Sequence, residues 1–246
     1  MNTEKSQNRY LSNDYILKNP TWDREDSPWK AMLVYEALQR TRISPTSIVE
    51  VGCGAGDVLD TLRSNYPGTR LTGFDIAPAA TTFWADHKEK DITFVLGDFL
   101  TDSSDHYDVA LLLDVIEHLD DPFHFLSKIR NRADHFVFHF PLDLSALSVL
   151  RETPLLYVRE KVGHIHYYTK SLALALLADC GFEVLDWKYS GAFFNAPQKS
   201  FKTRLAGVFR KILCALNRDL GVRALGGETL IVVARPSASG LAHNSK

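Results

Sequence analysis

Three glycines at alternate positions follow an apolar segment, in the run IVEVGCGAGD at residues 48–57. Glycine lets a ligand approach the backbone because no Cβ stands in the way. A helix starting near Asp57 would add exposed N–H groups, which favour an anionic group. A dinucleotide loop has its third glycine where this chain has Asp57, whose carboxylate would face a pyrophosphate badly. With Glu50 before it, the loop predicts a ligand that carries an ammonium and a carboxylate but no phosphate. The alternative is a strand–helix turn that merely needs glycine.

Carboxylates also end the next two apolar segments. Asp75 closes the run GFD, about 20 residues past the glycine loop, where an acidic residue can accept both hydroxyls of a ribose. Asp98 closes the run VLGD, and its oxygens suit an amino hydrogen of a base. The alternative for Asp75 is a cap of the helix predicted at Pro78. Because parallel strands place their carboxyl ends at one edge of a sheet, we expect these acidic residues to lie around one crevice.

Short apolar segments alternate with helical ones through the first half of the chain. The predicted strands are residues 47–51, 69–74, 92–96, 108–113 and 135–140. The predicted helices are residues 57–66, 78–89 and 122–132, and only a short polar connection joins the strands at 92 and 108. This alternation predicts a mostly parallel sheet covered by helices on both faces.

The flanking segments are less regular. Ser27 as a cap and Pro28 at the first helical position predict an N-terminal helix. Later in the chain, Thr169 caps a predicted helix that runs through Cys180 and stops at Gly181. The remaining predictions are strands at 182–189 and 228–234 and a helix at 199–220.

The ordered runs VEVGCGAGDVL, GFD, VLGDF and DVALLLDVIEHLDDP resemble class I S-adenosylmethionine-dependent methyltransferases. Within that class the chain is most similar to the small-molecule enzymes typified by ubiquinone-biosynthesis O-methyltransferases. The resemblance covers roughly residues 45–190 and the strand at 228–234, and it is specific for fold and cofactor but weakly so for substrate. It implies an α/β, Rossmann-like, doubly wound sheet of seven strands, mostly parallel with the last strand antiparallel. An N-terminal helix and a late helical cap would complete this fold.

The resemblance assigns the donor's methionine part to the glycine loop. Glu50 would help to hold its ammonium group through the loop. The residues that would line this part are Gly52, Cys53, Gly54 and Gly56.

The resemblance assigns the rest of the donor to residues at the ends of the following strands. Asp75, with Ile76 beside it, would bind the ribose hydroxyls. Asp98 would bind the adenine amino group, with Phe99 against the ring. The loop bordering the sulfonium would consist of Asp114 and Val115.

Methyl transfer to an oxygen benefits from a positioned base, and histidine suits that role near neutral pH. The candidates are His118, just past the fourth strand, and His164 and His166 in the run GHIHYYT. In an extended segment His164, His166 and Tyr168 would share one face and close over the substrate. The alternatives are a loop histidine packed on the next helix and a solvated strand edge. No third metal ligand is identifiable beside His164 and His166, so we expect no metal. Enzymes that methylate amide or exocyclic nitrogens usually carry a run of the Asn/Asp-Pro-Pro-Tyr type after the fourth strand. This chain has LDVIEH there, which disfavours those targets and leaves oxygen, carbon and some nitrogen acceptors open.

Composition sets broad limits. The 246 residues carry 28 basic and 30 acidic side chains, a net charge of −2, and 45% are hydrophobic. These values exclude a collagen-like, coiled-coil or wholly disordered chain and argue against a dedicated nucleic-acid binder. Three scattered cysteines indicate a reducing, cytoplasmic compartment, and no signal segment or apolar run of ~18–20 residues is visible.

We expect one catalytic domain at 45–236, with a covering segment at 1–44, a helical insertion at about 192–227 and a disordered tail at 237–246. The basic helix at 199–220 is expected to pack on the domain as a cap, and contact with an anionic membrane is the alternative. Membrane contact would make a lipid-linked acceptor attractive. The oligomeric state is not predicted. The aromatic residues considered for the acceptor pocket are Trp22, Trp29, Phe193 and Phe194.

The leading hypothesis is an S-adenosylmethionine-dependent methyltransferase that acts on an oxygen of a small molecule or sugar. One rival is an NAD-dependent oxidoreductase on a similar sheet, and Asp57 argues against it. The other rival is a non-catalytic regulatory protein that keeps the cofactor pocket.

Overall fold

A computed structural model describes residues 9–12, 14–88, 91–192, 213–214 and 216–238 of the chain. The strands are β1 (Ser47–Val51), β2 (Arg70–Asp75), β3 (Ile92–Leu96), β4 (Tyr107–Leu113), β5 (Ala133–Leu142), β6 (Phe182–Tyr189) and β7 (Glu228–Pro236). The α-helices are α2 (Asp14–Lys18), α3 (Ser27–Thr41), α4 (Asp57–Asn65), α5 (Thr81–Trp84), α6 (Phe99–Asp102), α7 (Pro122–Ile129), α8 (Ala146–Arg151), α9 (Thr153–Lys161), α10 (Lys170–Asp179) and α13 (Arg218–Leu225). Single 3₁₀ turns are η1 (Arg24–Asp26), η2 (Pro78–Ala80), η3 (Ala85–His87), η4 (Ile116–His118) and η5 (Arg130–Arg132).

The seven strands form one sheet in the order β3-β2-β1-β4-β5-β7-β6. Neighbours among β1 to β5 are parallel, whereas β7 is antiparallel to both β5 and β6. The predicted Rossmann-like sheet with an antiparallel last strand is therefore confirmed. The order reverses between β1 and β4, and open α/β sheets bind ligands at the carboxyl ends of the strands beside such a reversal.

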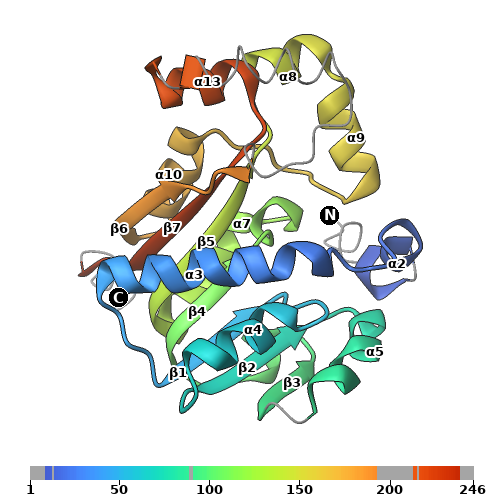
Figure 1. Ribbon diagram of the computed structural model, residues 1–246, viewed down its shortest axis with the longest axis vertical. Helices are drawn as coiled ribbons and strands as arrows, with labels where there is room; N and C mark the ends of the chain where they lie inside the picture. Colours follow the sequence, from blue (N-terminus) through green and yellow to red (C-terminus); the bar gives the residue numbers. More distant parts are fainter. Residues whose placement is uncertain (1–8, 13, 89–90, 193–212, 215, 239–246) are drawn as a thin grey trace.

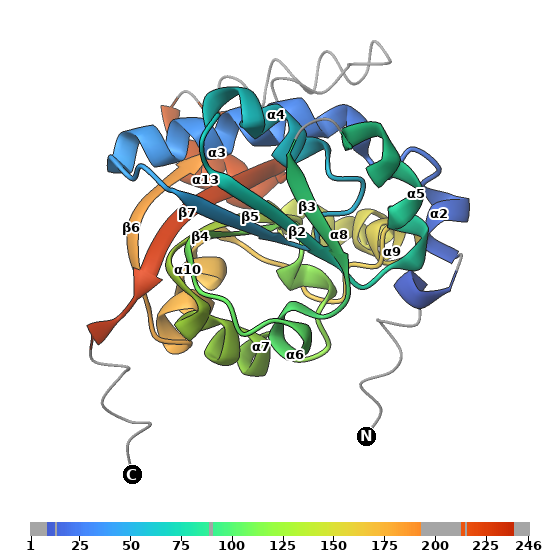
Figure 2. The same cartoon turned by 90° about the horizontal axis from the view of Figure 1, so that it is seen from below.

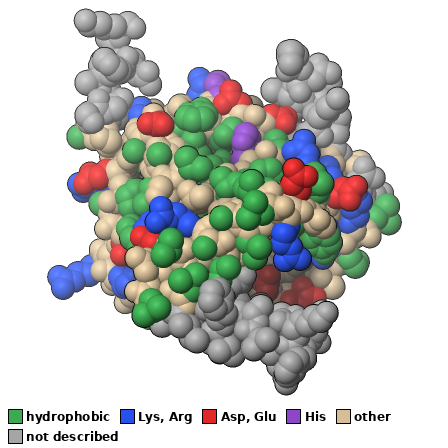
Figure 3. All heavy atoms as spheres, turned by 90° about the horizontal axis from the view of Figure 1, so that it is seen from above, with side chains coloured by type: hydrophobic (Ala, Val, Ile, Leu, Met, Phe, Trp, Pro, Cys, Tyr) green, Lys and Arg blue, Asp and Glu red, His purple; other side chains and the backbone are tan. Residues whose placement is uncertain are grey.

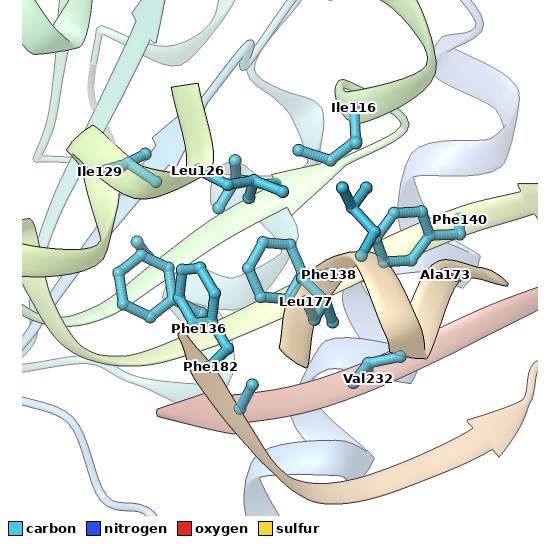
Figure 4. Packing of buried hydrophobic residues seen from close by; sticks show 14 of the residues in the cluster. Ile116, Leu126, Ile129, Phe136, Phe138, Phe140, Ala173, Leu177, Phe182 and Val232 are labelled. Atoms are coloured by element: carbon cyan, nitrogen blue, oxygen red, sulfur yellow. The ribbon is translucent and has the colours of Figure 1, made fainter. Parts of the chain in front are cut away.

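Helices cover both faces of the sheet (Figures 1 and 2). α3 and α4 lie on one face, and α7 and α10 lie on the other. Aromatic residues of β5 dominate the core on the α7 and α10 side, where Phe136, Phe138 and Phe140 are fully buried and Phe138 meets Phe182 edge to face (Figure 4). This double-sided burial explains why the central strands are continuous apolar runs.

Some predicted elements differ from the structure. The helix predicted at 78–89 is divided into η2, α5 and η3, and only the run TTFW of α5 is α-helical. α3 begins at Ser27 directly after η1, so Ser27 is not its cap. The helices α2, α6, α8 and α9 were not predicted. The sequence signals of α8 and α9 are the Ser145–Ser148 capping box and Pro154 in the first turn of α9.

The end of the molecule built from α8, α9 and α13 carries exposed apolar side chains, among them Leu150, Leu156 and Leu220. Figure 3 shows hydrophobic side chains scattered among charged ones on this side. α13 is the described part of the predicted helical cap, and most of the predicted basic helix at 199–220 lies outside the described residues. Within the described part of the chain, no helix has the length and apolar character needed to cross a membrane.

Candidate functional site

A cavity of about 950 Å³ opens at the carboxyl ends of the strands. The loops after β1, β2, β3 and β4 form its floor, and residues from the N-terminal segment complete its wall. The aromatic residues that this segment contributes are Tyr10, Tyr15, Trp22 and Trp29. The predicted acceptor-wall residues Trp22 and Trp29 thus reach the cavity, while Phe193 and Phe194 lie outside the described residues.

The glycine loop joins β1 to α4 with all three glycines at positive φ, +78° for Gly52, +51° for Gly54 and +87° for Gly56. A Cβ on Gly52 would lie 2.7 Å from Val115 Cγ2, and one on Gly54 would lie 2.5 Å from Trp22 Nε1. The turn therefore requires glycine both for its backbone conformation and for its close neighbours. Gly52, Cys53 and Gly54 line the cavity, but Gly56 does not. Gly56 precedes α4, and a Cβ there would lie 2.5 Å from Phe94 Cζ, so its contribution is the turn itself.

Glu50, near the end of β1, lines this cavity, and its carboxyl group has an oxygen without a hydrogen-bond donor in the part of the chain that the structure describes. The side chain is buried, and its Oε2 atom has no hydrogen-bond partner in the described chain. Burial raises the pKa of Glu50 to about 8, against the opposing effect of the Lys30 ammonium. A cationic group in the cavity would satisfy this oxygen, and the donor's ammonium group fits that requirement.

Asp75 ties the end of β2 to the glycine loop. Its Oδ2 accepts from the Gly54 N–H at 2.8 Å and its Oδ1 from the Ala77 N–H at 2.8 Å. Burial raises the pKa of Asp75, although these N–H groups oppose that effect. Asp75 and Ile76 both line the cavity, and each carboxylate oxygen keeps a lone pair for a further donor such as a ribose hydroxyl.

At the end of β3, Asp98 lines the cavity and caps α6 by accepting from the Leu100 N–H at 2.8 Å. The next residue, Phe99, was predicted to lie against the adenine ring, and the structure differs. Phe99 is 1% exposed, packs edge to face on Phe74 in the core, and does not reach the cavity. Because α6 begins at Phe99, the Phe99 side chain points into the hydrophobic core, and Leu100 lines the cavity instead.

Asp114 and Val115 follow β4 and line the cavity as predicted. Asp114, at a positive φ of 56°, contacts Lys30 Nζ at 2.7 Å and accepts from His139 Nδ1 at 2.6 Å. Burial by itself would raise the pKa of Asp114, but His139 and Lys30 hold it well below its usual range. Sequence reasoning missed Lys30 and His139. Their signal is a charged residue among the apolar positions of α3 and a histidine inside the buried strand β5.

The three candidate histidines do not share a face. His118 and His164 line the cavity with ring centroids 4.9 Å apart, whereas His166 lies outside it and donates from Nε2 to the Leu119 carbonyl at 2.8 Å. Tyr168 is buried against Phe140. The segment is not a strand, since Ile165 and His166 donate their N–H groups to the carbonyl of Glu117 and Gly163 turns the chain at φ +94°. The predicted common face of His164, His166 and Tyr168 is therefore wrong.

Burial lowers the pKa of His118 to about 4, and the neighbouring His164 adds to that effect. Next to it, Glu117 is fully buried, and neither of its carboxylate oxygens has a hydrogen-bond partner among the described residues. Burial, followed by the charge of Asp114, raises the pKa of Glu117 well above its ordinary value. Sequence reasoning quoted Glu117 but gave it no role.

Asp57 occupies the first turn of α4 and does not line the cavity. Its two oxygens accept from Arg24 at 2.8 and 2.9 Å, which joins η1 to α4. Asp57 therefore would not face a pyrophosphate bound in the cavity, and it does not distinguish a dinucleotide from another ligand. The class of the protein rests on other findings.

A reversed strand order, a glycine turn and acidic strand ends around one cavity define a Rossmann-like protein that binds a nucleoside-containing ligand. The chain belongs to the methyltransferase domain family, whose match spans residues 20–186. Together with the fold, this confirms the predicted class I S-adenosylmethionine-dependent methyltransferase, an enzyme whose methyl donor is S-adenosylmethionine. The finer likeness to ubiquinone-biosynthesis enzymes stays a prediction.

Solved structures share the fold at low sequence identity. The plantazolicin methyltransferase BpumL, crystallised with a desmethylplantazolicin analogue and S-adenosylhomocysteine, is 19% identical, with a TM-score of 0.64 over 94% of this chain and 93% of that one. The complex of the Haloferax volcanii Trm112 methyltransferase activator with a methyltransferase gives 16% identity and 0.63, over 95% and 98%. The N-methyltransferase NodS from Bradyrhizobium japonicum gives 16% and 0.55, over 96% and 99%. No curated protein sequence matches the chain.

Proposed function

We propose that this methyltransferase transfers the methyl group of S-adenosylmethionine to an oxygen of a small-molecule acceptor. The observation that carries the proposal is the continuity of one cavity from the glycine loop and Glu50 to His118 and His164. Its volume of about 950 Å³ lies at the upper end of small-molecule sites, ~300–1,000 Å³, and leaves room for an acceptor beside the donor.

In this proposal the glycine loop and Glu50 hold the methionine part of the donor, Asp75 the ribose and Asp98 the adenine amino group. The sulfonium then lies beside Asp114 and Val115. Gly56 and Phe99 act from outside the cavity, by shaping the turn and by supporting the strand ends. The N-terminal segment, proposed as the covering part of a single catalytic domain, closes the donor side through Tyr15 and Trp22.

The donor already activates its methyl group, so the protein must align the acceptor with the C–S bond and exclude water. The aromatic wall, with Trp22 and Trp29, serves the exclusion of water. His118 and His164 are the cavity histidines that can act on the acceptor hydroxyl, and His166 supports their loop from outside. A sugar or a lipid-linked molecule remains within the proposed acceptor class. A cytoplasmic site of action and a membrane contact through residues 199–220 stay predictions.

Donor recognition is tested by calorimetry with S-adenosylhomocysteine and with NAD. We expect binding of the former alone, and an Asp75→Asn variant should bind it about 10- to 100-fold more weakly because a charge-assisted hydrogen bond is lost. Asp134→Asn, at an exposed position, is the matched control and should bind as the parent does. Binding of NAD without S-adenosylhomocysteine would overturn the proposal.

Acceptor class is tested with methyl-labelled donor and a panel of phenols, sugars, amines and thiols. Transfer to hydroxyl compounds supports the proposal, and transfer restricted to amines contradicts it. Amines belong in the panel because one similar structure is named an N-methyltransferase.

A further inference from the structure

Three groups that bind metals, Glu117, His118 and His164, lie together beside the cavity, which the two histidines line. Nε2 of His118 and Nε2 of His164 each lie 3.9 Å from Oε1 of Glu117. One ligand atom from each of the three residues lies within 4.8 Å of the others. Ligands bonded to one tetrahedral Zn²⁺ at ~2.0–2.2 Å are about 3.4 Å apart. Each Nε2 atom therefore needs to come about 0.5 Å closer to Oε1 of Glu117, and no pair of the three ligand atoms needs to close by more than about 1.4 Å.

The backbone brings these groups together from distant parts of the sequence. Glu117 and His118 belong to η4, immediately after β4. The loop with His164 is fixed on η4 because Ile165 and His166 donate to the Glu117 carbonyl at 2.9 and 3.1 Å. A cluster supported in this way is formed before any ligand binds.

Both imidazole rings are oriented by their second nitrogen. Nδ1 of His164 donates to Asp143 Oδ2 at 2.6 Å, and Nδ1 of His118 donates to the Gly163 carbonyl at 3.2 Å. These bonds assign the protons to Nδ1 and leave the lone pairs of both Nε2 atoms for a ligand. A carboxylate or carbonyl acceptor behind each ligating histidine is the usual support of a metal site.

The carboxylate of this cluster has no hydrogen-bond donor among the described residues. Glu117 is 0% exposed, and neither of its oxygens has a hydrogen-bond partner in the described chain. A buried carboxylate that faces two imidazole lone pairs is unfavourable unless a proton or a cation joins them. Lys30 does not supply that cation, since its ammonium lies 2.7 Å from Asp114.

We propose that Glu117, His118 and His164 bind one divalent transition-metal ion, with Zn²⁺ as the first candidate. Two histidines and one carboxylate suit Zn²⁺, and three protein ligands leave a coordination position open. Because His118 and His164 line the cavity, that open position faces the acceptor space.

The role of the ion rests on the proposed function. An acceptor hydroxyl bound at the open position loses its proton to water at a lower pKa. The resulting alkoxide oxygen attacks the donor's methyl carbon, a C–O bond forms, and the C–S bond breaks with its electron pair going to sulfur. No electron donor or acceptor is needed. His118 and His164 then act as ligands, and the metal-bound oxygen replaces the histidine base.

Metal binding is tested on the full chain, stripped with a chelator and titrated with Zn²⁺ during equilibrium dialysis. We expect one ion per chain, and at least about 10- to 100-fold weaker binding after Glu117→Gln or His164→Ala. Asp143→Ala should weaken binding about 10- to 100-fold through its histidine. His106→Ala is the matched control, because His106 is an exposed histidine beside the carboxylate of Asp134 and should bind as the parent does. Equal Zn²⁺ binding by parent and Glu117→Gln proteins, or no binding by the parent, overturns the proposal.

Stability gives a readout that does not need the acceptor. Zn²⁺ should raise the melting temperature of the parent but not of Glu117→Gln, while the metal-free variant should melt no lower than the metal-free parent because the amide keeps the shape of the neutral carboxyl group that burial favours. In the Co²⁺-loaded parent, azide should shift the visible absorption bands through the open position, and an unchanged spectrum contradicts that position. S-adenosylhomocysteine should bind the Glu117→Gln variant as it binds the parent. Loss of the metal site is thereby distinguished from failure of the proposed donor binding.

Discussion

Glu50 shows at the scale of one residue how burial prepares a binding site. Its pKa of about 8 means that it is mainly protonated at pH 7 in the free protein. A cationic ammonium placed beside it favours the carboxylate and lowers that pKa. Donor binding near pH 7 should therefore release up to one proton from Glu50, and affinity should rise as pH increases from 6 toward 8. Calorimetry of S-adenosylhomocysteine binding in buffers of different ionisation enthalpy measures this release.

Glu50→Gln is the matched control, since the amide keeps the shape and cannot titrate. The variant should lose the part of the proton release that belongs to Glu50. Identical proton release in the two proteins would show that the ammonium does not lie near Glu50.

Gly54 combines a left-handed backbone with a close neighbour. Its φ is +51°, and a Cβ there would lie 2.5 Å from Trp22 Nε1. Gly54→Ala should lower the melting temperature by about 2–8 °C, because the left-handed conformation costs an alanine roughly 1–2 kcal/mol. It should also weaken S-adenosylhomocysteine binding, since Trp22 must move.

Gly68→Ala serves as its control. Gly68 has no positive φ, and a Cβ there would have no heavy atom of the described chain within 4 Å beyond its chain neighbours. Melting and binding should both stay close to the parent. A Gly54→Ala protein with parental affinity would mean that this loop is not part of the donor site.

At the scale of elements, ion pairs of Arg24 with Asp57 and Asp86 contribute to the attachment of the N-terminal segment to the rest of the fold. Arg24 of η1 contacts Asp57 of α4 in a bidentate manner, with the Arg24 side chain 32% exposed. Such a partly exposed pair contributes about 1 kcal/mol or less to global stability. Arg24→Gln should therefore leave the melting temperature nearly unchanged but increase amide hydrogen exchange in residues 14–26, which cover the cavity.

Arg40→Gln removes a comparable pair with Asp186 on the far end of α3. Exchange in residues 14–26 should not respond to this change. If both variants exchange as the parent does in that segment, the aromatic contacts of Tyr15 and Trp22 hold it without Arg24.

For the whole molecule, stability comes from the two hydrophobic layers on either side of the sheet. Phe138 is fully buried at the centre of one layer, between Phe136 and Phe140 (Figure 4). Phe138→Ala should cost about 3–5 kcal/mol of unfolding free energy, measured by denaturant unfolding. Phe123→Ala, at a side chain that is 54% exposed, should change it by less than about 0.5 kcal/mol. Similar losses in both variants would place the main core elsewhere.

The sequence by itself determined the alternating strands and helices of the mostly parallel sheet, the glycine turn and the acidic strand ends, whereas the antiparallel closing strand was expected only from the resemblance to known methyltransferases. The features that the sequence determined depend on local patterns: apolar runs, the residues that tolerate positive φ, and positions directly after a strand. Such patterns are also why the bounds of β1, β3 and β6 could be predicted to the residue, whereas the segment after β2, predicted as one helix at 78–89, is divided into η2, α5 and η3.

Only the tertiary structure decided which side chains share the cavity. Phe99 turns into the core, His166 turns toward Leu119, and Lys30 of α3 and His139 of β5 converge on Asp114. The side chain of His164 likewise groups with those of Glu117 and His118, whereas His166 lies outside the cavity. Contacts of this kind depend on how η4 and the loop at Gly163 pack, and no spacing within one segment encodes a distance between two segments.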